Sequence, residues 1–179
     1  MQAQPKDTHS LTARWRRICR HLWLDASDSH RLLPADACAQ LEAAVRDSEA
    51  RHLGELRLCV EAALPWDALR AGMDARQRAI DLFGRLRVWD TEHNNGVLIY
   101  LLLADRRIEV LADRGLHQRV APGEWDRLTQ SLAQALADGN VQAGLMQALQ
   151  QVSALLIAHH PAPDQAPRRN ELPDAVVLM

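Results

Sequence analysis

The fold of this chain is decided by residues 94–116, which read Asn94-Asn95-Gly96-Val97-Leu98-Ile99-Tyr100-Leu101-Leu102-Leu103-Ala104-Asp105-Arg106-Arg107-Ile108-Glu109-Val110-Leu111-Ala112-Asp113-Arg114-Gly115-Leu116. An Asn-Asn-Gly turn leads into a continuous apolar run from Val97 to Ala104. That length and continuity are typical of a strand buried on both faces of an α/β sheet. A second strand-forming run follows Asp105-Arg106, and this spacing predicts an antiparallel hairpin. The hairpin turn lacks glycine, which leaves its type open.

Helices and one further strand flank this hairpin. Residues 55–62 alternate between apolar and polar side chains, which predicts a first strand that is half exposed or near an edge. A helix over residues 74–86 follows, and the apolar positions of its predicted buried stripe are Ala79, Ile80, Phe83 and Leu86. The order strand, helix, apolar strand indicates a βαβ unit, whose two strands are parallel. Two more amphipathic helices follow the hairpin, the first starting at Pro122 and the second after Asn140.

The predicted fold class is α/β, a three-layer α/β/α sandwich on a small mixed sheet that combines the parallel βαβ unit with the antiparallel hairpin. We expect an N-terminal helical extension over residues 1–33 and the α/β domain over residues 34–160. Four prolines and several charges from Pro161 onward predict a disordered tail over residues 161–179.

Composition and charge indicate which partners and which cellular location to expect. The formal net charge of -2 gives no reason to expect nucleic acid as a partner. Cys19, Cys38 and Cys59 have no metal-ligand spacing, which favours reduced thiols. No uninterrupted apolar run reaches the roughly 18 residues of a membrane span. The N-terminus lacks the apolar core of a signal peptide, so the expected location is the cytoplasm.

The first predicted helix is basic and amphipathic. Leu11, Trp15, Ile18 and Leu22 recur at helical spacing, with arginines on the other side. One interpretation is peripheral contact with an anionic membrane surface through residues 11–23. The favoured interpretation is a helix that docks Trp15 and Trp23 on the domain.

The central stretch resembles the TPM domain, a family named for a thylakoid lumen protein, a photosystem II accessory protein and a nematode receptor modulator. The resemblance is carried by N-N-G, the apolar strand, D-R, the second strand and the glycine-leucine pair within residues 94–116, and it extends from about Glu42 to Ala158. Asp113 stands where the family usually has glycine, and His117 where it has glutamate. The usual secretory signal and membrane-spanning tail have no counterpart, which is similar to a soluble bacterial branch encoded beside LemA-type membrane proteins.

The resemblance implies one of two kinds of function. Acid-phosphatase activity and divalent-metal binding are associated with some members of the family. Repair or assembly of membrane complexes is associated with others, which implies a LemA-type or other membrane-associated protein as the partner.

Polar residues gather at two ends of the predicted hairpin. At the end near the carboxyl terminus of the first strand, Asp105, Glu61 and Asp67 are candidate ligands for Ca²⁺ or Mg²⁺. Asp105 and Arg106 are the catalytic candidates, with Arg106 positioned to hold a phosphate. The competing interpretation is a solvated hairpin turn.

The opposite end has a higher density of oxygen and imidazole ligands. The alternative metal cluster comprises Asp90, Asn94, Asn95 and Asp113, with Glu92, His93 and His117 nearby. The competing interpretation is loop polarity with Asx turns, because asparagine side chains also satisfy turn backbone. The family pattern has residues at both ends, so both remain open.

Two functions therefore remain. The favoured one is an accessory or binding protein that serves a membrane-associated assembly and binds a divalent cation. The alternative is a metal-dependent hydrolase of phosphomonoesters. The first is favoured because the sequence contains no recognised pattern for a nucleophile or general base.

Overall fold

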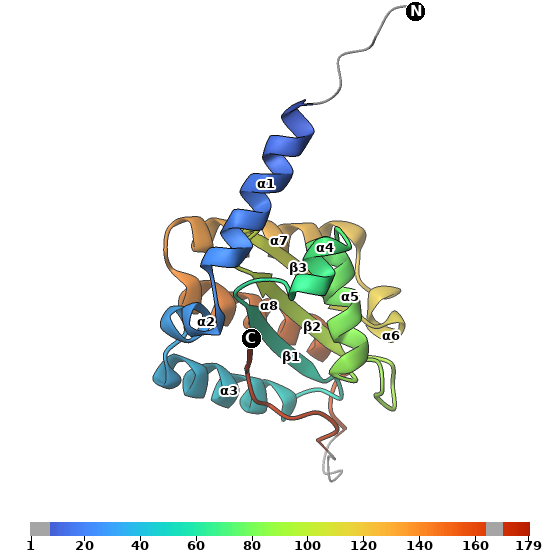
Figure 1. The fold of residues 1–179 in the computed structure, drawn as a ribbon. Helices are drawn as coiled ribbons and strands as arrows, with labels where there is room; N and C mark the ends of the chain where they lie inside the picture. Colours follow the sequence, from blue (N-terminus) through green and yellow to red (C-terminus); the bar gives the residue numbers. More distant parts are fainter. Residues whose placement is uncertain (1–7, 164–169) are drawn as a thin grey trace, which may run out of the picture.

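A mixed sheet of strand order β3-β2-β1-β4 lies at the centre of the computed structural model, which describes residues 8–163 and 170–179 (Figure 1). The strands are β1 (Leu56–Glu61), β2 (Val97–Leu102), β3 (Arg107–Ala112) and β4 (Val177–Leu178). The helices are α1 (Thr8–Trp23), α2 (Ala26–Leu32), α3 (Ala35–Glu49), α4 (Trp66–Arg70), α5 (Ala75–Arg85), α6 (Arg114–His117), α7 (Pro122–Ala137) and α8 (Val141–His159). The predicted α/β/α class is confirmed.

The hairpin and the βαβ unit form as the sequence predicts. β1 pairs with β2 in parallel from Leu56 opposite Val97, and β2 pairs with β3 antiparallel. Every residue of β2 is buried, as expected for a continuous apolar run at the middle of a sheet. The turn is longer than two residues: the Arg106 N–H donates to the Leu103 carbonyl at 3.0 Å, and Arg106 has a φ of 50°.

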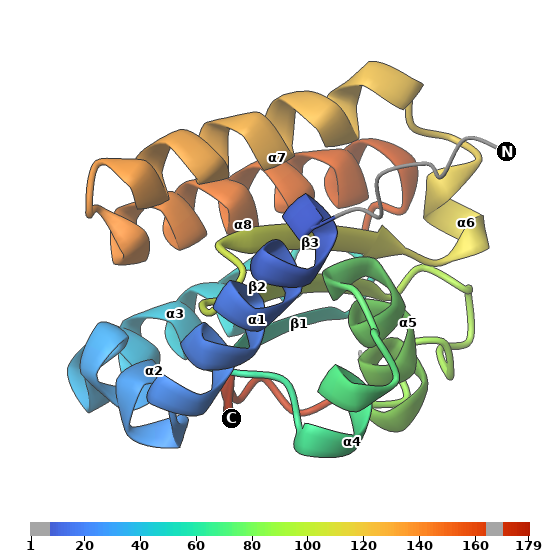
Figure 2. The same cartoon turned by 45° about the horizontal axis from the view of Figure 1, so that its top comes forward.

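Two apolar clusters cover the two faces of the sheet. Figure 2 shows α7 and α8 on one side of the strands and α4 and α5 on the other. The first cluster joins α3, α7 and α8 to the inward-facing side chains Leu56, Leu58, Val97 and Ile99. The second joins α4 and α5 to Cys59, Leu98, Tyr100 and Leu102. Alternate residues of each strand therefore enter opposite clusters, which is the pleat of a sheet covered on both faces.

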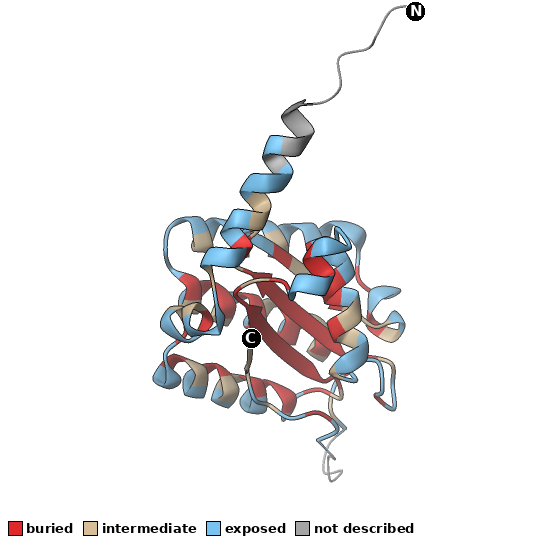
Figure 3. Cartoon of the chain, in the orientation of Figure 1, coloured by how far each residue is buried: buried red, intermediate tan, exposed pale blue. Residues whose placement is uncertain are grey.

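The prediction of a half-exposed first strand is wrong. All six residues of β1 are buried, and Figure 3 shows the inner strands as buried along their length. Two contacts cover the polar side chains of β1. Arg78 of α5 donates to the Glu61 carboxylate, and the Arg57 guanidinium donates to the Pro173 carbonyl. Polar side chains on this strand are thus buried with partners, and the alternation does not mark exposure.

The prediction of a disordered tail is also wrong for residues 170–179. β4 pairs with β1 in parallel, with Val177 opposite Cys59. Leu172 is buried in the second cluster, and Arg46 contacts Asp174 at 3.0 Å. The tail is ordered because β1 has a free edge and a polar face that the tail satisfies. Residues 164–169, and residues 1–7 of the N-terminal extension, lie outside the described part of the chain.

Helix α5 buries the predicted stripe except at one position: Ala79 is buried, and Phe83 and Leu86 pack half-buried against the second cluster. Ile80 is 57% exposed, whereas Arg78 and Leu82 are buried. The inward face also includes Arg78, because the buried Glu61 carboxylate is its partner. Asp74 caps the helix by accepting from the Gln77 N–H at 2.7 Å.

Helix α8 is long and apolar enough to cross a membrane by length and composition. Leu145, Leu149, Val152 and Leu156 are nevertheless buried in the first cluster. α8 packs against α7 and α3, so it serves as a core helix of this fold.

Candidate functional site

The C-terminal part of α1 contacts Asp105 in the loop that joins β2 to β3. The Asp105 carboxylate accepts from Arg17 Nε at 3.0 Å and contacts Arg17 Nη2 at 2.8 Å. His21 Nε2 lies 3.1 Å from Asp105 Oδ1, and Arg20 lies 3.6 Å from the same oxygen. Three cationic or donor side chains of one helix therefore surround a single carboxylate.

The hydrogen bonds of His21 define its tautomer. His21 Nδ1 accepts from the Leu64 backbone N–H at 3.0 Å. The proton of a neutral imidazole must then sit on Nε2, which donates to Asp105. Burial lowers the pKa of His21, and this effect exceeds the opposing effect of Asp105. Burial acts to raise the pKa of Asp105, but the hydrogen bonds and charges of Arg17 and His21 outweigh it and lower that pKa.

The structure does not bring the three carboxylates of the first predicted metal site into one cluster. The Glu61 carboxylate accepts from Arg78 Nη2 at 2.6 Å and from the Tyr100 hydroxyl at 2.7 Å. Asp67 is exposed in the first turn of α4, and Arg106 is exposed at the turn. Asp105 and Glu61 thus have separate arginine partners, and this arrangement does not fit a shared hard cation.

The opposite end of the hairpin is organised mainly by backbone contacts. Asn94 has a φ of 50°, its carbonyl accepts from the Gly115 N–H, and its side-chain oxygen accepts from Arg114. A Cβ on Gly115 would lie 2.5 Å from the Asn94 carbonyl oxygen, so this close approach requires glycine. Asp113 caps α6, with Oδ1 accepting from the Arg114 N–H at 2.6 Å.

The remaining members of that end do not converge on a cation. Asp90, Glu92, His93 and His117 are exposed. Asn95 is fully buried, and neither polar atom of its side chain has a hydrogen-bond partner among the described residues. Within residues 8–163 and 170–179, no group of three or more His, Cys, Asp or Glu side chains is arranged to hold a metal ion. The Asn94 side chain thus bonds the Arg114 side chain rather than turn backbone, and the buried Asn95 amide has no explanation in the fold.

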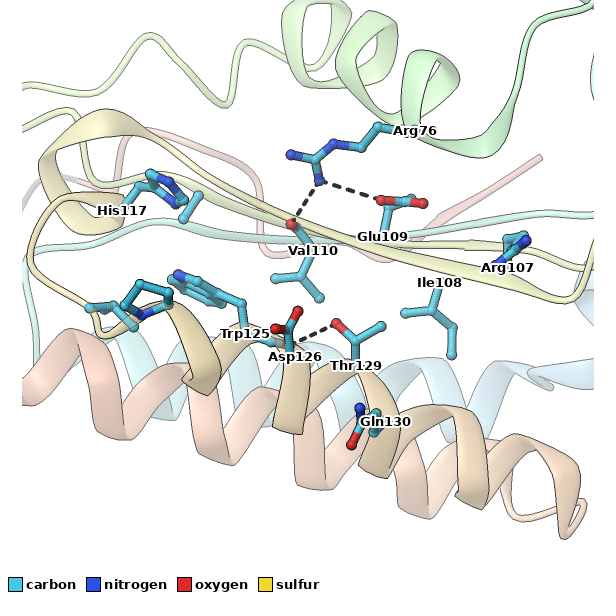
Figure 4. A pocket seen from close by; sticks show the side chains of 13 residues that line it. Arg76, Arg107, Ile108, Glu109, Val110, His117, Trp125, Asp126, Thr129 and Gln130 are labelled. Atoms are coloured by element: carbon cyan, nitrogen blue, oxygen red, sulfur yellow. Dashed lines mark hydrogen bonds and ion pairs between the residues drawn. The ribbon is translucent and has the colours of Figure 1, made fainter.

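A groove that the sequence did not indicate runs along the outer edge of β3 (Figure 4). It has a volume of about 660 Å³ and lies between α5 and α7. Arg76 reaches it from α5 and donates to the Val110 carbonyl at 3.3 Å. Trp125 and Asp126 line it from α7. A sequence signal for this groove was the short, charged second strand of the hairpin, which is typical of a sheet edge.

Comparison with known proteins identifies the family to which this chain belongs. The sequence profile of the TPM domain matches residues 26–155. The chain belongs to the TPM domain family. The TPM-domain chain is also similar to BA42 protein from the psychrophilic bacteria Bizionia argentinensis sp. nov., whose NMR structure is 26% identical in sequence with a TM-score of 0.70. That similarity covers 81% of this chain and 94% of BA42. No curated protein matches the sequence.

Helix α1 precedes the residues that match the TPM domain, and its indoles do not dock on that domain. Trp15 is 66% exposed and Trp23 is 88% exposed, so the predicted docking of both is wrong. The docked face instead carries Arg17, Ile18 and His21. Arg17 and His21 are four residues apart on one helix face, which was the sequence signal for this contact. The side chain of Leu11 lies outside the described residues.

Protonation of His21 should weaken the attachment of α1 to the TPM domain. Unfolded His21 gains a proton near pH 6.5, whereas folded His21, with its lowered pKa, stays neutral to lower pH. The unfolded state then binds more protons, so the free energy of unfolding should fall as pH decreases from 7.5 to about 5.5. We expect His21→Gln to reduce this dependence in urea unfolding, and His30→Gln, at an exposed histidine, to leave it unchanged. Equal slopes for wild type and His21→Gln would contradict the assignment.

Proposed function

We propose that this chain is a non-catalytic TPM-domain accessory protein that attaches to an anionic membrane surface, within a membrane-associated assembly, through α1. The observation that carries the proposal is the exposure of Trp15, Leu22 and Trp23 on a helix that extends from the α/β body (Figure 1). Large apolar side chains that face water on one helix mark an interaction surface.

The chemistry of the exposed face favours a lipid surface. Successive residues of a helix are rotated by about 100°, so Trp15, Leu22 and Trp23 fall on one stripe. Exposed arginines, among them Arg14 and Arg16, flank that stripe. Tryptophan is enriched where membranes meet water, and each arginine near an anionic surface contributes about 1 kcal/mol of attraction. A basic helix with an apolar stripe of this kind lies in the membrane interface.

The contacts of α1 with the hairpin support this orientation. Arg17 and His21 both contact Asp105. The opposite side of α1, which carries both indoles, therefore faces away from the domain. The same contacts bear on the hydrolase alternative. A cation at Asp105 or Glu61 would have to displace Arg17 or Arg78, each of which makes two or more short contacts with its carboxylate. For that reason we favour the binding role.

Flotation with anionic phosphatidylglycerol vesicles tests the proposal. Wild type should bind, and Trp15→Ser/Trp23→Ser should lose binding by at least about tenfold because the apolar stripe provides the insertion energy. Trp66→Ser/Trp89→Ser is the matched control, since Trp66 and Trp89 are also more than half exposed but lie outside α1. Neutral phosphatidylcholine vesicles should bind weakly.

A charge-reversal variant separates electrostatics from insertion. Arg14→Glu/Arg16→Glu should abolish binding at low salt, whereas Arg70→Glu on α4 should not. Arg17 is left intact because its reversal would release the helix from Asp105. Wild type that ignores anionic vesicles, or a Trp15→Ser/Trp23→Ser variant that binds as well as wild type, would refute the membrane attachment.

A further inference from the structure

Strand β3 has a free backbone edge. In the described sheet β2 is its only partner, because the strand order begins with β3. The groove of about 660 Å³ exposes this edge along Ile108, Val110 and Ala112, with Arg76 on one side and Trp125 on the other (Figure 4). An edge of this kind can pair with another strand.

The hydrogen-bond pattern identifies which groups are free. The Asp113 N–H donates to the Gly96 carbonyl at 2.8 Å, which makes this a hydrogen-bonded pair in the register of β2 and β3. Because such pairs alternate in an antiparallel ladder, every second residue of β3 turns its N–H and C=O outward. These residues are Ile108, Val110 and Ala112. The Arg76 contact with the Val110 carbonyl confirms the direction, since it comes from outside the sheet.

We infer that this edge is the interface of a symmetric dimer, in which β3 pairs antiparallel with β3 of a second copy. The dimer does not depend on the membrane function of α1. A two-fold axis at Val110 places Val110 opposite its own equivalent and Ile108 opposite Ala112. This register pairs all three outward-facing residues, whereas a shift by two residues leaves one of them without a partner. Two-fold pairing also makes one surface its own complement.

The charges on β3 match this register. Arg107 of one copy lies opposite Asp113 of the other, and the symmetry creates this pair twice. Arg107 is exposed, and the half-buried Asp113 has one carboxylate oxygen, Oδ2, that is buried without a hydrogen-bond partner in the described structure, so the side chain must turn outward to meet Arg107. Opposite charges directly across an antiparallel pair are favourable. Pairing ends there, because Arg106 adopts a positive φ and Arg114 begins α6.

Arg76 limits the strength of the dimer. Its guanidinium occupies the Val110 carbonyl, which the Val110 N–H of the second copy needs. Arg76 also contacts Glu109 at 3.4 Å and can keep that contact when it leaves the carbonyl. Arg76→Ala should therefore strengthen the dimer, an effect opposite to that of most interface truncations.

Sedimentation equilibrium without lipid tests the backbone pairing. Wild type should show a concentration-dependent rise to twice the monomer mass. Val110→Pro removes an N–H that β2 does not use, and proline is tolerated at such edge positions. This variant should be a monomer with a retained far-UV spectrum, while Val110→Ala, which keeps the N–H, should still dimerise. A monomeric wild type at all concentrations refutes the dimer, and the groove would then suit an extended peptide of another chain.

Charge reversal tests the register. Arg107→Asp and Asp113→Arg should each weaken self-association by at least about tenfold, because each homodimer would contain two like-charged pairs. An equimolar mixture of the two variants restores both opposite-charge pairs and should form heterodimers. Asp113→Arg also removes the carboxylate that caps α6. Val110→Pro leaves both the charges and this cap unchanged, so it tests the dimer without that side effect. A mixture that stays monomeric while wild type dimerises refutes this register.

Discussion

Arg78→Met should lower the free energy of unfolding by about 3–5 kcal/mol, because it leaves the Glu61 carboxylate buried without a cationic partner. Both side chains are almost completely buried, and Arg78 Nη2 lies 2.6 Å from Glu61 Oε1. Tyr100 donates to the same carboxylate at 2.7 Å, but a neutral hydroxyl cannot replace the charge. Urea unfolding monitored by far-UV circular dichroism measures the loss.

Two variants serve as controls for this prediction. Arg85→Met breaks the surface pair with Asp81 and should cost no more than about 1 kcal/mol. Glu61→Leu/Arg78→Met removes both charges together and should recover most of the stability lost by Arg78→Met alone, since apolar groups of similar volume replace buried ion pairs well. An Arg78→Met protein within about 1 kcal/mol of wild type would show that water reaches Glu61.

Gly96→Ala should be the most damaging substitution of the Asn-Asn-Gly turn. A Cβ at Gly96 would lie 1.9 Å from the Val88 carbonyl oxygen and 2.9 Å from Val88 Cγ1. Because the obstacle is backbone, β2 or the loop before it must shift, at a cost of roughly 3 kcal/mol or more. The melting temperature and urea midpoint should both fall.

Gly84→Ala is the matched control for Gly96→Ala. Gly84 lies in α5 and is exposed, and no atom of the described residues lies within 4 Å of the position that a Cβ would take there. Alanine is favoured over glycine inside helices, so Gly84→Ala should raise the free energy of unfolding by about 0.5–1 kcal/mol. Opposite signs for the two changes would tie the first effect to space at Gly96. Equal small effects would contradict the close approach to Val88.

The sequence is sufficient to predict those parts of the fold that depend on local pattern. The apolar run of β2 and the βαβ order correctly predicted a parallel pair, an antiparallel hairpin and helices on two faces. The errors arose where distant residues satisfy polar groups. Arg57 and Glu61 indicated an exposed face, but Pro173 and Arg78 cover them. Periodicity contains no information about such partners.

In the candidate site, too, local pattern was predictable and contacts between distant residues were not. Asp105 lies at the end of the hairpin, where the sequence placed it, but its partner Arg17 is 88 residues away in the chain. Asp105, Glu61 and Asp67 were grouped by the topology of the sheet alone. Their side chains separate because Glu61 lies on β1, Asp105 in the hairpin turn and Asp67 on α4, and because arginines on two different helices reach Asp105 and Glu61. The membrane alternative depended on which side of α1 docks, and the apolar spacing of Leu11, Trp15, Ile18 and Leu22 pointed to a different side from the one that Arg17 and His21 occupy.

The distribution of aromatic side chains has an optical consequence. Four of the five tryptophans, Trp15, Trp23, Trp66 and Trp89, are 54–88% exposed, so the native protein should already emit at long wavelengths. Unfolding changes the surroundings of Trp125 most, which makes total tryptophan emission a weak reporter of the core. The single tyrosine, Tyr100, is the better one: burial, followed by Glu61, raises the pKa of its hydroxyl. The appearance of tyrosinate absorbance in alkali should therefore coincide with loss of the folded sheet.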